Sequence, residues 1–178
     1  HNDAAMVLYL QDDHENLASR ARSALLVHLI RPAYFTSLRT EQQLGYVVSA
    51  MNPVLRERGA VGFVIQSPVA PVQELKKRTL TFLQQQVKKL EEMETQEFQE
   101  NKMGLISVLL EKDKNLSARA QRYWSNLDRG IVSFDAAKQL AEQVDGLDQR
   151  DMIEFVKVTL NKLTDNYFMV FSQGKFAE

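Results

Sequence analysis

The 178-residue chain contains no cysteine, which excludes a disulfide-stapled scaffold, a thiolate-ligated zinc site and thiol catalysis. It has no surplus of charge either, because 22 basic side chains face 23 acidic ones, and this balance argues against a dedicated nucleic-acid-binding protein. No apolar run approaches the roughly 20 residues of a membrane-spanning helix, and no signal peptide is recognisable. Glycine and proline are scarce, at 7 and 4 residues, and no low-complexity linker interrupts the chain. We therefore expect a single domain over residues 1–178.

The chain begins with His1 rather than with an initiator methionine. We expect it to be an excerpt or a processed product of a longer protein. A chain of this length can bury a hydrophobic core without disulfides or metals. An excerpt can nevertheless lack the residues that perform the parent protein's chemistry.

The hydrophobic pattern predicts an α+β fold, because β-rich apolar runs alternate with stretches of helical periodicity. We expect strands near residues 5–10, 46–51, 60–66 and 167–171. We expect helices over residues 15–30, 33–43, 72–90, 95–111, 116–128, 134–144 and 148–160. Pro32 should interrupt the first helical stretch, and Gly45 should end the second. This order favours a small, mainly antiparallel sheet packed with several helices.

The three histidines lack the spacing of a zinc site. A helical zinc motif needs two histidines on one face, with a glutamate as general base. His1, His14 and His28 have no histidine partner at the required offsets, and Ala18 stands four residues after His14. His28 is best explained as a packing residue and His14 as a solvated one. We expect no metal site in this chain, and no serine-nucleophile or phosphate-binding glycine motif is present.

One segment combines residues that could act on a ligand. Arg39 carries a fixed cation with a planar set of donors, and Tyr46 follows seven residues later at the start of a predicted strand. Arginine and tyrosine donors suit a carbonyl or an oxyanion. Residue types alone favour the plainer alternative, in which Arg39 pairs with a surface carboxylate or backbone carbonyl and Tyr46 only packs.

The stretch from residue 38 to 48, Leu-Arg-Thr-Glu-Gln-Gln-Leu-Gly-Tyr-Val-Val, resembles a signature of the insulinase (pitrilysin) family of zinc metallopeptidases. In that signature an aromatic residue precedes Leu-Arg-Thr, and Gln-Leu-Gly-Tyr and β-forming residues follow. The similarity extends over nearly the whole chain, through segments at residues 62–67, 116–117, 123–124 and 134–135. The length and composition of the first segment make it specific.

The resemblance implies an insulinase-type unit from the C-terminal half of a peptidase whose units enclose a chamber. It implies that Arg39 and Tyr46 are catalytic and substrate-binding residues, which contact the substrate carbonyl and stabilise the transition state. The zinc cofactor would be bound by another domain, so the fragment alone should not hydrolyse peptides. Partners would be peptide substrates and the other domains, without nucleic acid or membrane. The unit resembles one truncated at its N-terminus, and a bacterial parent would favour the periplasm.

Two alternatives stay open beside this leading hypothesis. The parent could be a non-catalytic homologue that serves as a scaffold, or as a partner subunit that supplies Arg39 and Tyr46 to the zinc site of another chain. An upstream His-x-x-Glu-His motif would distinguish it from a peptidase. An unrelated α+β binding domain is the third interpretation.

Overall fold

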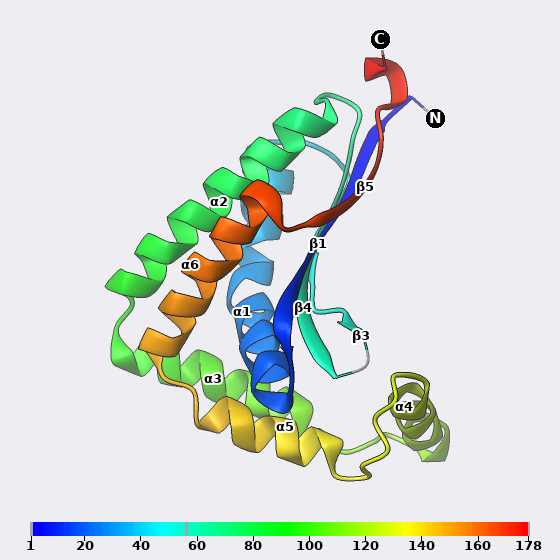
Figure 1. Cartoon of the computed structure of the whole chain (residues 1–178), viewed down its shortest axis with the longest axis vertical. Helices are drawn as coiled ribbons and strands as arrows, with labels where there is room; N and C mark the ends of the chain where they lie inside the picture. Colours follow the sequence, from blue (N-terminus) through cyan, green and yellow to red (C-terminus); the bar gives the residue numbers. More distant parts are fainter. Residues whose placement is uncertain (1, 56, 178) are drawn as a thin grey trace.

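The computed structural model describes residues 2–55 and 57–177 (Figure 1). The strands are β1 (Ala4–Glu15), β2 (Val47–Met51), β3 (Val54–Leu55), β4 (Arg58–Ser67) and β5 (Phe168–Ser172). The α-helices are α1 (Leu17–Phe35), α2 (Val72–Glu92), α3 (Thr95–Leu109), α4 (Leu116–Asp128), α5 (Ala136–Asp145) and α6 (Gln149–Asp165). A π-helix, η1 (Thr36–Glu41), extends α1, and a 3₁₀ turn, η2 (Gly174–Phe176), follows β5. The α+β prediction is confirmed.

The sheet is antiparallel throughout its described strands, in the order β2-β4-β1-β5, with the short β3 paired to the outer end of β4. β1 and β4 form its centre, and Leu8 of β1 stands opposite Phe63 on one side and Met169 on the other. The first and last strands of the chain are therefore direct neighbours. The two strands expected at residues 46–51 and 60–66 are neighbours in this sheet, with Val48 of β2 opposite Ile65 of β4.

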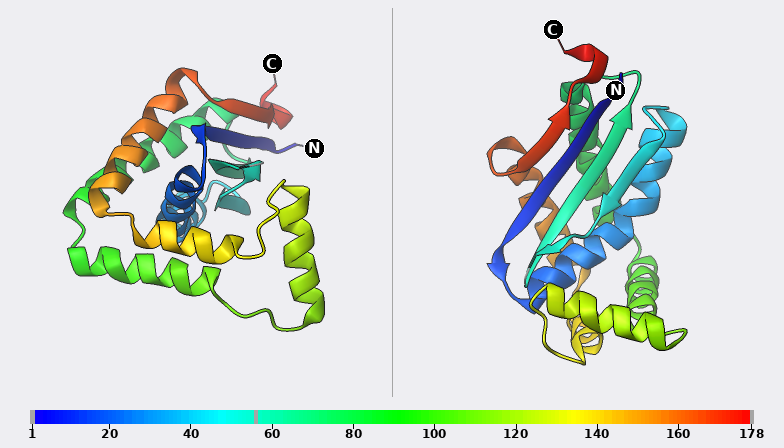
Figure 2. Two further views of the ribbon diagram at one scale, coloured as in Figure 1. Left: turned by 60° about the horizontal axis from the view of Figure 1, so that its bottom comes forward. Right: turned by 90° about the vertical axis from the view of Figure 1, so that its right-hand side faces the viewer.

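Helices cover one face of this sheet, and the hydrophobic core lies between them. α1, α2 and α6 lie along that face, while α3 and α5 cross beneath them (Figures 1 and 2). Alternate side chains of β1 point into the core, so Met6 and Leu8 are almost fully buried whereas Val7 is 41% exposed. The pleat of a strand explains this alternation, because neighbouring side chains point to opposite faces.

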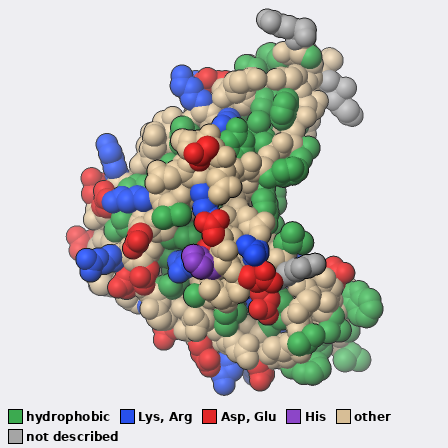
Figure 3. Space-filling model, viewed as in Figure 1, with side chains coloured by type: hydrophobic (Ala, Val, Ile, Leu, Met, Phe, Trp, Pro, Cys, Tyr) green, Lys and Arg blue, Asp and Glu red, His purple; other side chains and the backbone are tan. Residues whose placement is uncertain are grey.

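The opposite face of the sheet is open to solvent and largely apolar. Val7 of β1 stands opposite Val170 of β5 and Val64 of β4, and Phe168 and Val47 mark two sides of the same surface. The space-filling view shows apolar side chains along this hollowed side of the molecule (Figure 3). We call this surface the open sheet face.

The first helix does not stop at Pro32, contrary to the prediction from sequence. α1 continues through the proline to Phe35, and η1 follows without a break. Pro32 lies in the last turn of α1, where it removes only one backbone donor. The buried side chains of Ile30, Tyr34 and Leu38 continue the helical spacing into the core. Burial of this stripe outweighs the lost hydrogen bond.

The prediction that Gly45 ends this helical stretch in the manner of a capping glycine is also wrong. The residue in the left-handed region is Gln43, with φ 50°, directly after the C-cap residue Gln42. Gly45 is needed for a different reason, because a Cβ at this position would lie 1.8 Å from the carbonyl oxygen of Gln66. The glycine allows the loop to approach the end of β4 closely.

Helix starts follow the capping signals of the sequence. Asn16 caps α1 by accepting a hydrogen bond from the backbone N–H of Ser19, and Asn115 caps α4 in the same way. Asp148 and Asp151 form a reciprocal capping box at the start of α6. Within residues 2–55 and 57–177, no helix is long and apolar enough to cross a membrane.

Candidate functional site

Arg39 and Tyr46 lie side by side, as the sequence predicts. The guanidinium carbon of Arg39 is 4.7 Å from the centre of the Tyr46 ring. The same atom is also 4.7 Å from the centre of the Phe35 ring. The guanidinium therefore contacts two aromatic rings, a cation–π arrangement that restricts its orientation.

Phe35 is a member of this site that sequence reasoning did not assign. It precedes Arg39 by four residues, and on a helical segment this spacing places two side chains on one face. The sequence signal was the i, i+4 pair of an aromatic residue and an arginine. The signature required an aromatic residue before Leu-Arg-Thr but gave it no role.

The helical turn that carries Arg39 is anchored in the core. Leu38 is fully buried, and so is Tyr34, one turn earlier. The Tyr34 ring packs against Phe63 of β4 and Phe82 of α2, with centroid distances of 5.0 and 5.1 Å. Its hydroxyl shares a hydrogen bond of 2.9 Å with Thr79 of α2, which also satisfies a polar group that burial would otherwise leave unpaired.

Burial also affects the titration of this anchor. Desolvation raises the pKa of the Tyr34 phenol well above its ordinary value, against a smaller lowering by the Thr79 hydrogen bond. Tyr34 is therefore neutral at physiological pH and acts as a structural residue. It fixes the base of the site and is not a candidate for proton transfer.

Tyr46 is presented by a tight reversal of the chain after η1. The left-handed conformation of Gln43 turns the backbone, and the Leu44 N–H donates to the carbonyl of Leu38 at 3.0 Å. Leu44 is buried, so it fixes the turn to the core. Tyr46 follows at the entrance of β2 with 82% of its surface exposed. A buried anchor thus stands two residues before an exposed aromatic side chain.

A polar network connects η1 to α2. The Gln42 side chain donates to the Ser37 hydroxyl at 3.1 Å and accepts from Arg78 at 3.3 Å. Arg78 in turn donates to Glu74 at 2.6 Å. Arg78 is therefore paired with Glu74 and Gln42. Arg39, three residues before Gln42, is the guanidinium that lies beside Tyr46.

The polar groups of the pair have no protein partner among the described residues. Neither the Arg39 guanidinium nor the Tyr46 hydroxyl takes part in a hydrogen bond or ion pair there, and their contacts are through ring faces. The plainer alternative, in which Arg39 pairs with a carboxylate, finds no support in the described contacts. Two neighbouring hydrogen-bond donors of this kind can bind one carbonyl oxygen or oxyanion.

Metal ligands do not gather in the part of the chain that the structure describes. No group of three or more histidine, cysteine, aspartate or glutamate side chains there could hold an ion. The His14 side chain is 68% exposed, in keeping with the prediction of a solvated residue. His28 is half-buried at one side of α1, opposite Gly104 of α3, where its ring nitrogen would lie 3.4 Å from an added Cβ.

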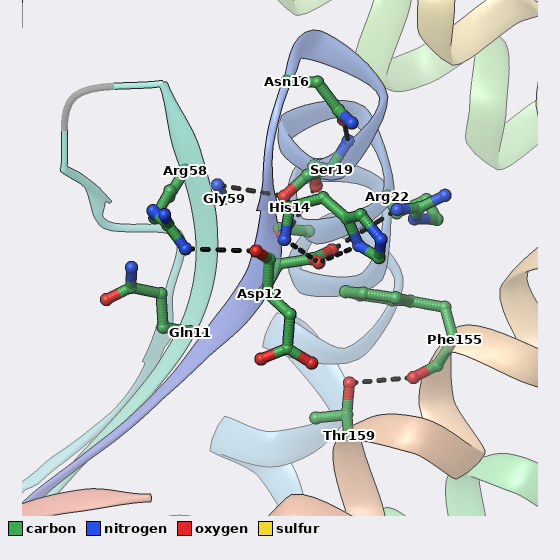
Figure 4. Close-up of polar contacts among 12 residues, drawn as sticks. Gln11, Asp12, His14, Asn16, Ser19, Arg22, Arg58, Gly59, Phe155 and Thr159 are labelled. Atoms are coloured by element: carbon green, nitrogen blue, oxygen red, sulfur yellow. Dashed lines mark hydrogen bonds and ion pairs between the residues drawn. The ribbon is translucent and has the colours of Figure 1, made fainter. Parts of the chain in front are cut away.

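A second cluster of charged side chains stands at the end of β1 (Figure 4). The Asp12 carboxylate accepts hydrogen bonds from the backbone and the ring of His14, at 3.0 and 3.1 Å, and from Arg22 at 3.4 Å. Arg22 also lies over the Phe155 ring, with 5.6 Å to its centroid. Lys162 donates to the carbonyl of Gln11 at 2.8 Å. The charges pair with one another, although the Arg22 Nε is buried without a hydrogen-bond partner, and the cluster joins β1, α1 and α6 as a structural contact.

Comparisons with known proteins agree with the fold and with the motif. A family model described as PQQ synthase PqqF-like, C-terminal lobe domain 4, matches residues 25–124, more than half of the chain. The human insulin-degrading enzyme is 31% identical over 162 residues, and Protease 3 of Escherichia coli strain K12 is 27% identical over 154 residues. These matches cover 90% and 86% of this chain but 16% of each relative. The chain thus spans about one sixth of the length of these relatives.

Solved structures share the whole architecture. Pitrilysin superposes with a TM-score of 0.81 at 24% identity, over 99% of this chain and 19% of its own. A protease from Helicobacter pylori superposes with a TM-score of 0.75 at 14% identity, over 96% of this chain and 41% of its own. These similarities show a pitrilysin-like fold. The match over residues 25–124 shows in addition that the chain belongs to the PqqF-like family of C-terminal lobe domains and is a domain of the insulinase (pitrilysin) class of peptidases.

Proposed function

We propose that this chain is the substrate-binding unit of a longer insulinase-like zinc metalloendopeptidase, and that Arg39 and Tyr46 contact the peptide backbone. The observation that carries this proposal is the Arg39 guanidinium stacked at 4.7 Å on the ring of an 82% exposed Tyr46. Neither polar group has a partner among the described residues. Two neighbouring hydrogen-bond donors that no described protein group occupies are available to bind a ligand carbonyl.

The chemistry of the pair suits a carbonyl that gains negative charge. As water adds to a peptide carbonyl, its oxygen becomes an oxyanion, and donors that already point at it lower the barrier. Arg39 supplies a permanent positive charge and Tyr46 a neutral hydroxyl donor. The two rings that hold the guanidinium reduce the entropy lost when the substrate binds.

The zinc centre of such an enzyme would lie in another domain. The described residues contain no group that could hold zinc, and the histidine spacing of the sequence fits none. The role proposed for residues 1–178 is therefore binding and charge stabilisation within one unit of a multi-unit protein. Peptides small enough to enter an enclosed chamber would be the substrates.

Substitutions in the longer protein test the proposal. Tyr46→Phe keeps the ring beside Arg39 and removes only the hydroxyl, so we expect kcat/KM for a peptide to fall at least about tenfold. Arg39→Ala removes the charge as well as the stacking, and we expect a fall of about 100-fold. Activity is measured with a fluorogenic peptide at neutral pH.

Two variants, at the partly buried Tyr167 and the exposed Arg150, serve as matched controls. Tyr167→Phe and Arg150→Ala make the same chemical changes outside the proposed site, and they should leave kcat/KM unchanged. Phe35→Leu removes one face of the stack, and its loss should be smaller than that of Arg39→Ala. Wild-type kcat/KM in both Tyr46→Phe and Arg39→Ala would show that the assigned roles are wrong.

A further inference from the structure

A cavity with an unusual charge distribution lies among α1, α3, α4 and α5. Its volume is about 330 Å³, at the lower end of the range typical of small-molecule sites. The side chains that line it include no aspartate or glutamate but four arginines, namely Arg20, Arg31, Arg122 and Arg129. The whole chain has a net charge of −1, so this concentration of positive charge is local.

Arg20 is the buried member of this group. Only 8% of its surface is exposed, and its Nε atom is buried without a hydrogen-bond partner. Among the ion pairs of residues 2–55 and 57–177, none involves Arg20. A buried guanidinium with an unpaired Nε donor is unfavourable, and a bound anion that accepts from it would reduce the penalty.

Two charged neighbours act on Arg20 in opposite directions, and no ion pair or hydrogen bond among the described residues joins it to either. Burial has the largest effect and lowers the pKa of its guanidinium, Glu57 raises the pKa, and Arg129 lowers it again. Arginine keeps its charge in proteins regardless of such shifts. Arg129 is therefore close enough to add to the positive field at Arg20.

The other arginines differ in how far they are satisfied. Arg122 is neutralised by Asp113 through two hydrogen bonds of 2.9 and 2.7 Å. Arg31 uses its Nε to donate to the carbonyl of Ala50 at 2.9 Å, which leaves its charge without an acid. Arg129 follows α4 on the exposed side and has no ion pair with the described residues. Arg20 and Arg129 are thus the two guanidinium groups with most capacity for a ligand.

The rest of the lining is mostly apolar. It includes Leu105 and Leu109 of α3 and Leu140 of α5. Burial, and then Arg31, lower the pKa of His28, so this ring adds no charge at neutral pH. A polyvalent anion would lose much of its hydration against these apolar groups. A ligand with one anionic group and an apolar body would match both parts of the cavity.

We propose that this cavity binds a carboxylate attached to an apolar body, with the carboxylate against Arg20 and Arg129 and the body against α3 and α5. A guanidinium can bind a carboxylate through two parallel hydrogen bonds, which explains the choice of head group. A medium-chain fatty acid and the C-terminus of a peptide that ends in an apolar residue share this chemistry. The site is separate from the Arg39–Tyr46 pair and does not depend on the function proposed for it.

Isothermal titration calorimetry on the 178-residue chain tests the proposal, with octanoate as the first probe. We expect saturable binding with one site per chain. Octanamide has the same apolar body without the charge, and it should bind at least about tenfold more weakly. Inorganic phosphate, a charge without the body, should not displace octanoate. Equal affinities for octanoate and octanamide, or displacement by phosphate, would overturn the proposal.

The source of the carboxylate is distinguished by N-acetyl-Val-Leu with a free C-terminus. Competition with octanoate by this peptide, but not by its C-terminal amide, would assign the site to peptide termini. Octanoate binding without competition would assign it to fatty acids. Failure of both probes to bind would overturn the proposal.

Substitution of the two arginines locates the site. Arg20→Met should weaken octanoate binding at least about tenfold, and Arg129→Gln should weaken it about threefold. Arg150→Gln, at an exposed position outside the cavity, should leave octanoate binding unchanged. Arg20→Met should also unfold at the same or a higher temperature than the ligand-free parent, because it removes a buried guanidinium whose Nε has no hydrogen-bond partner. Unchanged binding in both variants, or a clearly lower unfolding temperature for Arg20→Met, would contradict the assignment.

Discussion

At the scale of single residues, the Arg39–Tyr46 site depends on buried and accessible side chains that lie only a few positions apart in the sequence. Arg39 contacts two aromatic rings, while Leu38 beside it is fully buried. Cation–π contacts at exposed positions contribute about 0.5–1 kcal/mol each, so two of them restrain the guanidinium without burying it. The guanidinium therefore keeps a preferred orientation and stays accessible to a ligand.

Gly45 supports the first residue-scale prediction. A Cβ at this position would lie 1.8 Å from the carbonyl oxygen of Gln66, and backbone atoms cannot move away as a flexible side chain can. Gly45→Ala should lower the free energy of unfolding by about 1–3 kcal/mol or more, measured by urea denaturation. Gly146→Ala is the matched control, because the nearest atom to its Cβ would be 3.6 Å away. A Gly45→Ala variant as stable as the Gly146→Ala variant would contradict the close approach.

Asp12 supports a prediction about pH. Burial raises the pKa of its carboxyl, but hydrogen bonds from His14 and Ser19 and the charge of Arg22 outweigh burial, so the net pKa lies below 3.8. A carboxyl with a depressed folded pKa stabilises the protein above its unfolded pKa, and this contribution is lost as the pH falls through the folded value. At pH 7, Asp12→Asn should cost about 1–3 kcal/mol of unfolding free energy.

The difference between wild type and Asp12→Asn should therefore shrink as the pH falls from 5 towards about 2. Denaturation curves at several pH values measure this difference directly. Asp128→Asn, at an exposed position, should differ little from wild type across the same range. A cost for Asp12→Asn that stays constant with pH would show that packing rather than charge explains it.

The family signature in the sequence singled out Arg39 and Tyr46, whereas residue types alone favoured the plainer alternative, and neither could show how the pair is held. Both residues belong to a signature whose spacing is visible in one sequence. Phe35 was visible too, yet nothing in its type separates a stacking aromatic from a packing one. Arg20 gave no signal, because an arginine on an amphipathic helix is normally solvated. The cavity that it lines is formed in part by α3 and α5, which lie far away in the sequence.

At the scale of elements, the helical spacing of apolar residues determined the structure more strongly than the local breaker did. Pro32 predicted an interruption, whereas the continued burial of Tyr34 and Leu38 kept α1 and η1 continuous. The loop after η1 turns at a left-handed Gln43 rather than at the glycine. Propensity is a weak guide where tertiary contacts decide, and here the close approach to β4 required the glycine elsewhere.

Helix α6 allows a prediction about capping. Asp148 accepts from the backbone N–H of Asp151 at 2.8 Å, and the Asp151 side chain accepts from the Asp148 N–H at 3.0 Å. Asp148→Ala should lower the free energy of unfolding by about 1 kcal/mol, measured by chemical denaturation. Asp135 also stands at a helix start, but its side chain makes no capping hydrogen bond. Asp135→Ala should therefore cost less, and equal losses would argue against the capping box.

At the scale of the whole molecule, the sheet is covered on one face only. The apolar run at residues 5–10 predicted a strand, and Met6 and Leu8 of β1 are almost fully buried, but Val7 between them is 41% exposed. A single sequence cannot distinguish a strand that is buried on both faces from a strand whose second face is apolar but not covered by the same chain. The number of layers therefore could not be predicted, nor could the pairing of β1 with β4 and β5, although the α+β class could.

The open sheet face supports the last prediction, which concerns self-association of the isolated chain. Val7 and Val170 stand opposite each other on neighbouring strands, and Phe168 beside them is 64% exposed. Contiguous apolar surface of this kind promotes contact between copies. β5 adds an edge strand that has no outer neighbour among the described strands. Sedimentation of the 178-residue chain should show association that increases with concentration.

A charge at the centre of this face should reverse the association. Val170→Lys places a cation where two copies would meet, so we expect a monomer over the same concentration range. The core is not involved, because Val170 is 55% exposed, and the unfolding temperature should change little. Val158→Lys makes the same change on α6, at a residue 43% exposed on the helical layer, and should associate like wild type. Association that persists in Val170→Lys would place the contact elsewhere, and a monomeric wild type would show that the open face alone does not drive it.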